Sequence, residues 1–552
     1  MTHTATTPAA SNNVDGYSVG QTLTVTCEAP AHGGAFVART EQGVIFVRHG
    51  IVGEQAEVRI TAIGPKRRFY FADVISVPVP SLARRPHPWI QADALATEEE
   101  RTEATGVPEL LGGMEYGHIS LAEQRRYKTD IVRTQINRLG GLPLESPLLT
   151  NLIVEELPLR DNNEGLSWRT RVRYNVTKVR TQPGNEPSDE PGNQKNSGKE
   201  SPAVTWRIGM HPYRASQPVP VIDFPLAATE LRNLELEKLN LRGVREVEAT
   251  VSSRGRVLLQ FIVDPRFSIE EVAKDIEQQA SDAWGLLAKR KISLFSPQST
   301  SNGKPKRGRP GSAHSPYRRV PEGDQLLGAG LRSVTEEVTF GSRRFSYQVS
   351  AGGFWQIHRA APSTMVGTML TMLRPQEGEC TLDLYAGAGL FTAALADAVG
   401  ATGTVVSIEG SPVTHKDARS NFAPDGCSRT ENSANTRIEV IRGDVARHLV
   451  DLKTAIEFGE IPAIDAVVLD PSREGANRTT LERLDALDPK RILYVACDPA
   501  SLGRDTGILR DLGWDMVQLR AFDMYPNTHH VESVALFERA PAKPRPRRRR
   551  TT

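Results

Sequence analysis

The feature that most constrains the fold is an alternation of strand-like and helix-like segments from about residue 350 to residue 539. Short apolar runs alternate with longer segments of helical periodicity. This pattern is typical of a doubly wound α/β domain, with a parallel sheet covered by helices. Ligands and chemistry collect at the carboxyl edge of such sheets. The residues that follow each predicted strand are therefore the first candidates for a functional site.

One of these strand ends carries a cysteine. The apolar run 492–496 predicts a buried strand, and Asp498-Pro499 ends it. The thiol of Cys497 is therefore predicted to lie at the carboxyl tip of the strand. A free cysteine is often only a small buried apolar side chain. The neighbouring motifs favour a placed nucleophile instead.

Four other strand ends carry a glycine turn or an acid. Residues 383–389 form a glycine-rich turn, which lets a cofactor approach the backbone but is a weak signal alone. Glu409 ends the next strand about twenty residues on, where such folds hold ribose hydroxyls. Asp444 and Asp470 end two further strands, and Asp444 could accept a hydrogen bond from an adenine amine. One such acid is typical of a helix cap, but four sites in strand order predict a nucleotide-type cofactor site.

A carboxylate also enters the last predicted strand. Glu532 precedes the apolar run 533–537. Burying a carboxylate is unfavourable unless it is paired or functional. The alternative is a solvent-exposed position at the strand edge, since glutamate is rarely buried.

The N-terminal region predicts a small β-barrel. Short β-like runs between residues 17 and 79 are separated by glycines. The last loop and strand read Lys66-Arg67-Arg68-Phe69-Tyr70-Phe71. Cations beside aromatic rings suit RNA through phosphate contact and base stacking. An ordinary exposed turn followed by a core strand explains the segment equally well.

The central region mixes helix, strand and low-complexity sequence. Residues 121–139 have helical periodicity, and a later strand carries alternating arginines in the range 169–173. These arginines predict one basic face, turned either to solvent or to RNA. The polar inserts at 182–202 and 297–316 are expected to be flexible loops.

Composition excludes several classes of protein. The formal net charge of the 552-residue chain is only +2, which does not by itself indicate nucleic acid. Basic residues gather in the tail 543–550, however, and such runs often bind polyanions. Four scattered cysteines are too few for a disulfide framework. No apolar run is long enough to span a membrane and no signal-peptide core is present, so we expect a cytoplasmic protein.

Five motifs together resemble the bacterial RNA uracil-5-methyltransferases. They are Phe354-Trp355-Gln356, the turn 383–389, Asp470-Pro471-Ser472-Arg473-Glu474-Gly475, Ala496-Cys497-Asp498-Pro499 and the segment 523–532. The N-terminal barrel resembles the TRAM module carried by the ribosomal-RNA members. The resemblance covers most of residues 17–540. The sequence departs from the family pattern at Ser472, where a second proline is usual, and at His358, where asparagine is common.

The resemblance implies an S-adenosylmethionine-dependent enzyme that methylates C5 of a uridine in RNA. It implies Cys497 as the nucleophile that adds to C6 and Glu532 as the base. The implied cofactor contacts are Gln356, Tyr385, Leu390, Glu409, Asp444 and Asp470. The TRAM-like barrel favours 23S rRNA as the substrate, with tRNA as the alternative.

The resemblance also bears on metal binding. Many relatives hold an iron–sulfur cluster through cysteines around a Cys-Gly-Gly-Cys segment. Here the matching stretch reads Leu111-Gly112-Gly113-Met114, with His118 following. Such clusters need cysteine thiolates, so we expect no iron–sulfur cluster and no other metal.

Together these observations predict an α/β fold: a C-terminal Rossmann-like methyltransferase domain, an N-terminal OB-like β-barrel of TRAM type and a central α+β RNA-binding region. The predicted boundaries are 1–16 for a disordered N-terminus, 17–79 for the barrel, 80–349 for the central region, 350–540 for the methyltransferase domain and 541–552 for a basic disordered tail. We expect a monomer that does not associate with membranes. Two alternatives are a catalytically inactive RNA-binding protein and a cytosine C5-methyltransferase. The joint presence of Cys497, Glu532 and Asp470 disfavours the first, and the lack of an identifiable proton donor to ring N3 disfavours the second.

Overall fold

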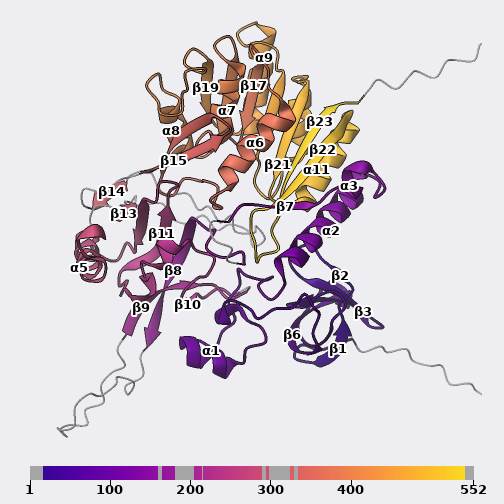
Figure 1. Cartoon of the computed structure of the whole chain (residues 1–552), viewed down its shortest axis with the longest axis vertical. Coiled ribbons are helices and arrows are strands. Elements are labelled where there is room, and N and C mark those ends of the chain that lie inside the picture. Colours follow the sequence, from indigo (N-terminus) through magenta and orange to yellow (C-terminus); the bar gives the residue numbers. More distant parts are fainter. Residues whose placement is uncertain are drawn as a thin grey trace, which may run out of the picture.

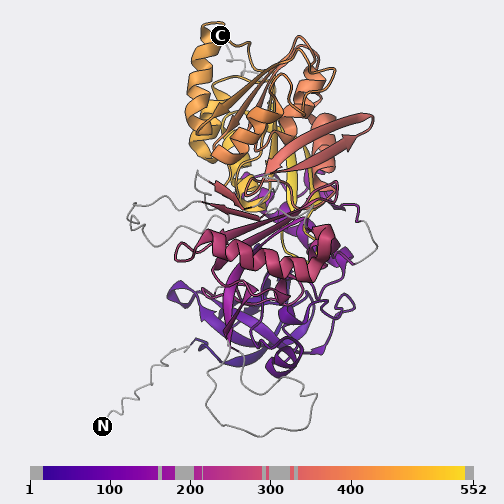
Figure 2. The same cartoon turned by 90° about the vertical axis from the view of Figure 1, so that its left-hand side faces the viewer.

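The computed structural model describes residues 16–159, 164–180, 204–213, 215–288, 294–297, 324–327 and 333–540. The insert at 182–202, all but the first residue of the insert at 297–316, and the tail after residue 540 lie outside the described residues. The C-terminal domain forms the upper part of the molecule in Figures 1 and 2, and both the N-terminal barrel, at the lower right of Figure 1, and the central sheet, at its lower left, lie beneath it.

The N-terminal barrel is one curved sheet of six strands. Its strands are β1 (Thr22–Thr26), β2 (Ala29–Pro30), β3 (Phe36–Thr40), β4 (Gly43–Arg48), β5 (Gln55–Ile63) and β6 (Phe69–Val79), in the order β1-β5-β6-β4-β3-β2. Side chains alternate along β6: Tyr70 is buried in the core, whereas Phe69 and Phe71 are half-buried on the outside. The ring of Phe46 lies within 6 Å of both, at 5.7 and 5.8 Å. The barrel therefore presents an aromatic cluster beside the cations of residues 66–68.

A helical segment leads from the barrel to the C-terminal domain. It contains α1 (Glu98–Thr105), α2 (Leu121–Gly140), the short α3 (Pro147–Thr150) and strand β7 (Val154–Glu156). Helix α2 packs tightly on a helix of the C-terminal domain, where glycines permit backbone contact. A Cβ on Gly503 would lie 2.6 Å from the carbonyl of Gln135, and one on Gly507 would lie 2.8 Å from that of Leu139.

The central sheet is antiparallel. Its strands are β8 (Arg171–Arg180), β9 (Val204–Met210), β10 (Val219–Pro220), β11 (Val244–Val251) and β12 (Val257–Val263), in the order β10-β9-β8-β11-β12. Helix α4 (Thr229–Arg232), helix α5 (Ile269–Ala288), strand β13 (Leu294–Pro297) and strand β14 (Asp324–Leu327) accompany it. Two of the predicted surface arginines are bonded within the sheet: Arg171 Nε donates to Thr250 Oγ1 at 3.1 Å, and Arg173 pairs with Glu248 at 2.7 Å. An RNA-facing role for this strand stays a prediction.

The C-terminal domain has the alternation predicted from the sequence. After the hairpin β15 (Ser333–Phe340) and β16 (Arg343–Ser350) come α6 (Ala361–Leu373), β17 (Cys380–Leu384), α7 (Leu390–Val399), β18 (Thr404–Glu409), α8 (Pro412–Asn421), β19 (Arg437–Arg442), α9 (Val445–Glu457), β20 (Ala466–Leu469), α10 (Asn477–Asp485), β21 (Arg491–Ala496), α11 (Pro499–Asp511), β22 (Trp514–Asp523) and β23 (Glu532–Arg539). The sheet order is β19-β18-β17-β20-β21-β23-β22-β7. Strands β17 to β21 are parallel, and β23 is antiparallel to both β21 and β22. The predicted α/β fold class is confirmed.

The eighth strand of this sheet comes from the N-terminal half of the chain. Strand β7 pairs in parallel with β22, with Val154 beside Ala521. Val132 and Ile136 of α2 join the same hydrophobic core. The predicted boundary at residue 350 separates these segments from the sheet that they complete, because local periodicity carries no information on such distant pairing.

Candidate active site

The ladder between β21 and β23 brings the two predicted catalytic residues together. The antiparallel register pairs Ala496 with Ser533. Continuing that register by one residue sets Cys497 opposite Glu532. Side chains that face each other across an antiparallel pair have Cβ atoms about 5 Å apart. A thiol and a carboxylate therefore share one position at the edge of the sheet.

Glu532 is held inside the protein. It is only 2% exposed, and the hydroxyl of Tyr525 donates to its Oε2 at 3.2 Å. Burial raises the pKa of this carboxyl well above its usual value, and the charge of Asp470 adds to that effect. The hydrogen bond from Tyr525 and the charge of Arg473 act in the opposite direction. A carboxylate in such surroundings is a stronger base than one in water.

Cys497 lies at the tip of β21 and is partly exposed. Burial raises the pKa of its thiol, and the charges of Glu532 and Asp470 raise it further. The guanidinium of Arg473 lowers it, whereas the carboxylate of Asp498 raises it. The thiol is therefore protonated at neutral pH unless some of this negative charge is offset.

The predicted glycine turn joins β17 to α7. Gly389 has a φ of 95° and precedes the first turn of α7, where a Cβ would lie 2.2 Å from the ring of Phe422. Only glycine fits there. Tyr385, directly after β17, has a φ of 64°, which is unfavourable for a residue with a side chain. Leu390 is the buried first residue of α7. Backbone strain of this kind clusters at functional sites.

Two of the predicted acids make backbone hydrogen bonds at this edge. Glu409 accepts from the amide of Gly387 at 2.8 Å and from that of Ser411 at 2.6 Å, so it ties the turn to the end of β18. Asp444 is exposed and accepts from the amide of Arg447 at 2.9 Å. It thus caps α9, the alternative role considered for such acids. A carboxylate oxygen can accept more than one hydrogen bond, so both retain capacity for a ligand.

Two further carboxyls lie at the adjoining strands: Asp383 is fully buried and Asp470 is half-buried. Burial raises the pKa of Asp470 to about 7, and the charges of Asp383 and Glu409 contribute. Burial likewise raises the pKa of Asp383 to about 7, although Thr392 Oγ1 donates to its Oδ2 at 2.5 Å. Gln356, on the loop after β16, is also buried. Asp383 was not among the predicted site residues, although an acid inside the apolar run of β17 was a usable signal.

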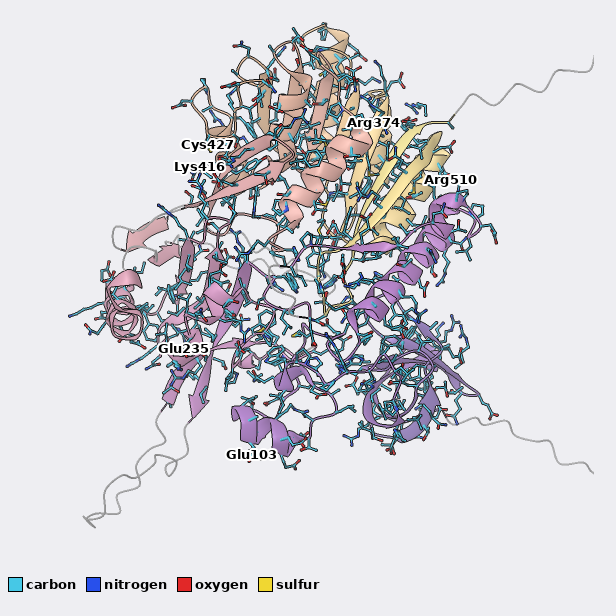
Figure 3. All side chains as sticks on the ribbon, viewed as in Figure 1. Glu103, Glu235, Arg374, Lys416, Cys427 and Arg510 are labelled. Atoms are coloured by element: carbon cyan, nitrogen blue, oxygen red, sulfur yellow. The ribbon has the colours of Figure 1, made fainter. Side chains whose placement is uncertain are left out.

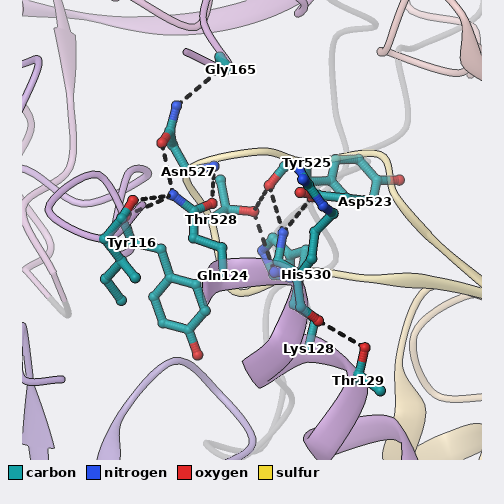
Figure 4. Close-up of polar contacts among 12 residues, drawn as sticks. Tyr116, Gln124, Lys128, Thr129, Gly165, Asp523, Tyr525, Asn527, Thr528 and His530 are labelled. Atoms are coloured by element: carbon teal, nitrogen blue, oxygen red, sulfur yellow. Dashed lines mark hydrogen bonds and ion pairs between the residues drawn. The ribbon is translucent and has the colours of Figure 1, made fainter. Parts of the chain in front are cut away.

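The segment 523–532, which carries Glu532 at its end, is clamped by the N-terminal half of the chain (Figure 4). Lys128 on α2 donates from Nζ to Asp523 Oδ1 at 2.6 Å and to the carbonyl of Tyr525 at 3.1 Å. Lys128 and Asp523 are both buried. Gln124, one turn earlier, accepts from the amide of Asn527 at 2.8 Å. Sequence reasoning missed this clamp because its partners lie about four hundred residues apart.

Glu115 and Tyr116, which follow the Gly112-Gly113 stretch, also contact this loop. The amide of Tyr116 donates to the carbonyl of Asn527 at 3.0 Å. Oε2 of Glu115 lies 3.6 Å from Nδ1 of His529. Across the residues that the structure describes, no group of three or more His, Cys, Asp or Glu side chains could hold a metal ion. The absence of an iron–sulfur cluster stays a prediction.

A separate cavity of about 810 Å³ lies between the end of α2 and the outer side of α11. It contains none of the predicted site residues. Its lining includes Arg138, Arg478, Arg504 and Arg510, and it reaches Ala540, the last residue before the basic tail. Arg510 lies at the flank of the C-terminal domain, opposite Cys427 (Figure 3). Among the described helices, none is long and apolar enough to cross a membrane.

The fold and this edge of the sheet define a methyltransferase of the S-adenosylmethionine-dependent class. Family models match residues 330–540 as tRNA (Uracil-5-)-methyltransferase and residues 18–75 as a TRAM domain. An uncharacterized RNA methyltransferase of Streptomyces coelicolor is 31% identical over 95% of this chain and 94% of its own length. Another, of Streptomyces avermitilis, is 30% identical over 95% and 99%.

Two less similar proteins also match over most of this chain. A 23S rRNA (uracil(1939)-C(5))-methyltransferase RlmD of Shewanella is 27% identical over 92% of this chain and 94% of its own. The crystal structure of Pyrococcus abyssi tRNA (uracil-54, C5)-methyltransferase has the same fold, with a TM-score of 0.55, 16% identity and coverage of 93% of this chain and 99% of that one. The chain belongs to the RNA (uracil-5-)methyltransferase family, as its motifs predicted, and is an S-adenosylmethionine-dependent enzyme of that family.

Proposed function

We propose that this enzyme methylates C5 of a uridine in 23S rRNA through a covalent bond between Cys497 and C6 of the base. The observation that carries the proposal is the register of β21 and β23, which pairs Ala496 with Ser533 and, continued by one residue, sets Cys497 opposite the buried Glu532. A nucleophile and a base that face each other can act on adjacent carbons of one ring.

The residues at the sheet edge suit the cofactor. S-adenosylmethionine offers a sulfonium and an ammonium cation together with hydroxyl and amine donors, and this edge offers acceptors. We assign the contacts to Gln356, Tyr385, Leu390, Glu409, Asp444 and Asp470. The raised pKa of Asp470 reflects buried negative charge, which a cation would stabilise. When bound, the cofactor supplies a methyl group as an electrophile.

Starting from the deprotonated thiol of Cys497, the protein groups then account for the electron pairs and for the C5 proton. The thiolate of Cys497 adds to C6, and the electrons of the C5–C6 double bond move toward the O4 carbonyl as an enolate. C5 thereby becomes nucleophilic enough to accept the methyl group. Glu532 next removes the proton from C5. The electrons of that C–H bond re-form the C5–C6 double bond as the Cys497 thiolate leaves.

The RNA substrate follows from the chain as a whole. A uracil must leave its stack to reach a thiol at the edge of a sheet. The barrel presents cations beside the aromatic cluster of Phe46, Phe69 and Phe71, which suits unstacked bases. The relative named for 23S rRNA and the enzyme named for tRNA cover similar shares of this chain, but the first is 27% identical and the second 16%, and this difference favours ribosomal RNA. We propose that the protein acts as a monomer, which light scattering of the purified chain tests.

The deciding experiment uses unmodified 23S rRNA fragments and tRNA transcripts with S-adenosylmethionine. 5-Methyluridine should form in the rRNA, and Cys497→Ala should abolish it while the protein still binds the cofactor. Cys427→Ala, at an exposed cysteine, should leave turnover unchanged. Normal turnover by Cys497→Ala would exclude the covalent mechanism. Methylation of cytidine, or of tRNA alone, would correct the substrate, and no methylation of any RNA would favour an inactive RNA-binding protein.

A further inference from the structure

The barrel reaches into the active site through the loop of residues 31–35, which joins β2 to β3 and is called here the barrel loop. At its tip, Nε2 of His32 donates to Oδ2 of Asp498 at 2.7 Å. Asp498 directly follows Cys497 in the sequence. An RNA-binding module thus touches the residue beside the nucleophile.

The Asp498 carboxylate has two partners of different origin. Its Oδ1 accepts from the amide of Ser501 at 2.8 Å and so caps α11, while Oδ2 takes the bond from His32. The charge of Asp498 is one of those that raise the pKa of the Cys497 thiol. A protonated His32 offsets that charge. The hydrogen bond to Asp498 raises the pKa of His32, so the imidazolium persists to higher pH than in a free histidine.

A second contact leads from the barrel loop to the base. Gly34 packs so closely on His529 that a Cβ would lie 3.0 Å from the ring. The ring centroids of His529 and His530 are 4.0 Å apart, and His530 lies edge-on to Tyr525. The hydroxyl of Tyr525 is bonded to Glu532. One chain of contacts therefore runs from the barrel loop to Glu532.

We infer that the barrel loop is a positioning element of the active site: His32 holds and neutralises Asp498 beside the nucleophile, and Gly34 supports the histidine pair beneath the base. The inference rests on the proposed function only for the roles of Cys497 and Glu532. It gives the barrel a task beyond RNA binding, because displacement of the barrel would also relax the two catalytic groups.

Other charged groups face the same thiol and must be held constant in any test. They are Glu532, Asp470 and Arg473 around Cys497, together with Glu115, His529 and His530 beside the barrel loop. Substitutions at His32 leave all of these in place. The pair is partly exposed, with His32 at 41% and Asp498 at 22%, so a moderate effect is expected.

The first test needs no RNA. Alkylation of Cys497 by iodoacetamide, followed by mass spectrometry from pH 6 to pH 9, reports the thiolate fraction. His32→Gln should slow it by about fivefold at low pH, and the difference should vanish as pH rises through the pKa of the wild-type histidine. His32→Lys should restore the rate and keep it at high pH, because lysine stays charged. Exposed Cys427 is the internal reference.

The second test uses a matched pair of glycines. Gly33 and Gly34 have φ values of 91° and 88°, so an alanine strains the backbone equally at either site. A Cβ on Gly33 meets nothing within 4 Å, whereas one on Gly34 meets His529. Gly34→Ala should therefore lower kcat about tenfold more than Gly33→Ala, with equal RNA affinity.

Each outcome either supports or overturns the positioning role of the barrel loop. Superimposable alkylation profiles for His32→Gln and the wild type would overturn the role of His32. Equal kcat for the two alanine variants would overturn the contact through Gly34, as would a loss confined to RNA binding. If the wild type methylates no RNA, the proposed function fails, but the alkylation profiles still test the barrel loop.

Discussion

The cofactor edge and the catalytic loop lie on the same sheet but are built in different ways. Apart from Gln356, the residues proposed to contact the cofactor come from one stretch, residues 383–470, and its ties are local: Glu409 accepts from the amide of Gly387, 22 residues away. The catalytic loop, residues 523–532, is held by α2, 395 residues away at the Lys128–Asp523 pair. The first is held by contacts within its own domain, whereas the second is held by contacts with the N-terminal half of the chain.

This difference separates cofactor binding from catalysis. Damage to α2 or to the barrel should leave the glycine turn and its acids intact. It should displace Tyr525 and Glu532, which depend on Lys128, Gln124 and the barrel loop. We therefore expect variants in α2 or the barrel that bind the cofactor with normal affinity but have a low kcat.

The largest effect is expected at the base. Glu532→Gln keeps the size and burial of the side chain but cannot accept the C5 proton, so turnover should fall about 10²- to 10⁴-fold. The covalent protein–RNA adduct should accumulate and appear as a band of reduced mobility on a denaturing gel. Glu538→Gln, at the exposed end of the same strand, is the control and should turn over normally. Slow turnover without any adduct would show that Glu532 acts before C6 is attacked.

The next effect is expected at the clamp. Lys128→Met leaves Asp523 buried without its cation, which destabilises a protein by about 3–5 kcal/mol. The thermal midpoint should fall by about 10 °C. The double variant Lys128→Met/Asp523→Leu should recover most of the loss. Arg126→Met, on the exposed face of the same helix, should change stability by less than about 1 kcal/mol.

Activity distinguishes this clamp from an ordinary core contact. Lys128→Met should still bind S-adenosylmethionine below its melting temperature, because the cofactor edge has its own ties. Its kcat should fall, because the loop before Glu532 loses its anchor. Parallel loss of cofactor affinity and kcat would contradict the division between the two regions.

The sequence was informative where contacts are local. Hydrophobic periodicity, together with the residues that end helices and strands, was enough to predict the strand ends at Glu409, Asp470 and Cys497 and the helix 121–139. It was uninformative where distant segments meet. Nothing around Lys128 indicates that its partner is Asp523, or that the glycine at position 34 makes room for His529, because pairing across several hundred residues leaves no local pattern.

A smaller effect is expected from Asp470, the half-buried acid at the proposed cofactor edge. An acid of pKa about 7 is ionised about tenfold less at pH 6 than at pH 8, and only the ionised form of Asp470 attracts a sulfonium. Affinity for S-adenosylmethionine should therefore rise with pH, about tenfold over this range. Because the pKa of Asp470 is higher in the folded protein than in the unfolded chain, its contribution to the free energy of unfolding falls as the pH rises from about 4 to about 7.

Calorimetric titration at several pH values checks this dependence. Asp470→Asn should lower the affinity and flatten its rise with pH. S-adenosylhomocysteine, which lacks the sulfonium charge, should show a weaker rise than S-adenosylmethionine. Glu474→Gln, at an exposed acid of the same loop, is the control. A steep rise that persists in Asp470→Asn would assign the titration to Asp383 instead.

The smallest effect is expected from the basic tail, residues 541–552, which contains none of the proposed site residues. The described chain ends at Ala540, beside the cavity lined by Arg138 and Arg510. Removing residues 541–552 should leave turnover at saturating RNA unchanged, because the proposed catalytic groups are not in the tail. RNA binding should weaken, and the slope of log affinity against log salt should flatten by about 0.7 for each lost phosphate contact on single strands.

The affinity of the full-length and the truncated protein for one rRNA fragment, measured at several salt concentrations, checks this prediction. Arg138→Ala tests the cavity separately. An unchanged slope would mean that the tail does not touch RNA, and the barrel would then hold the substrate without it.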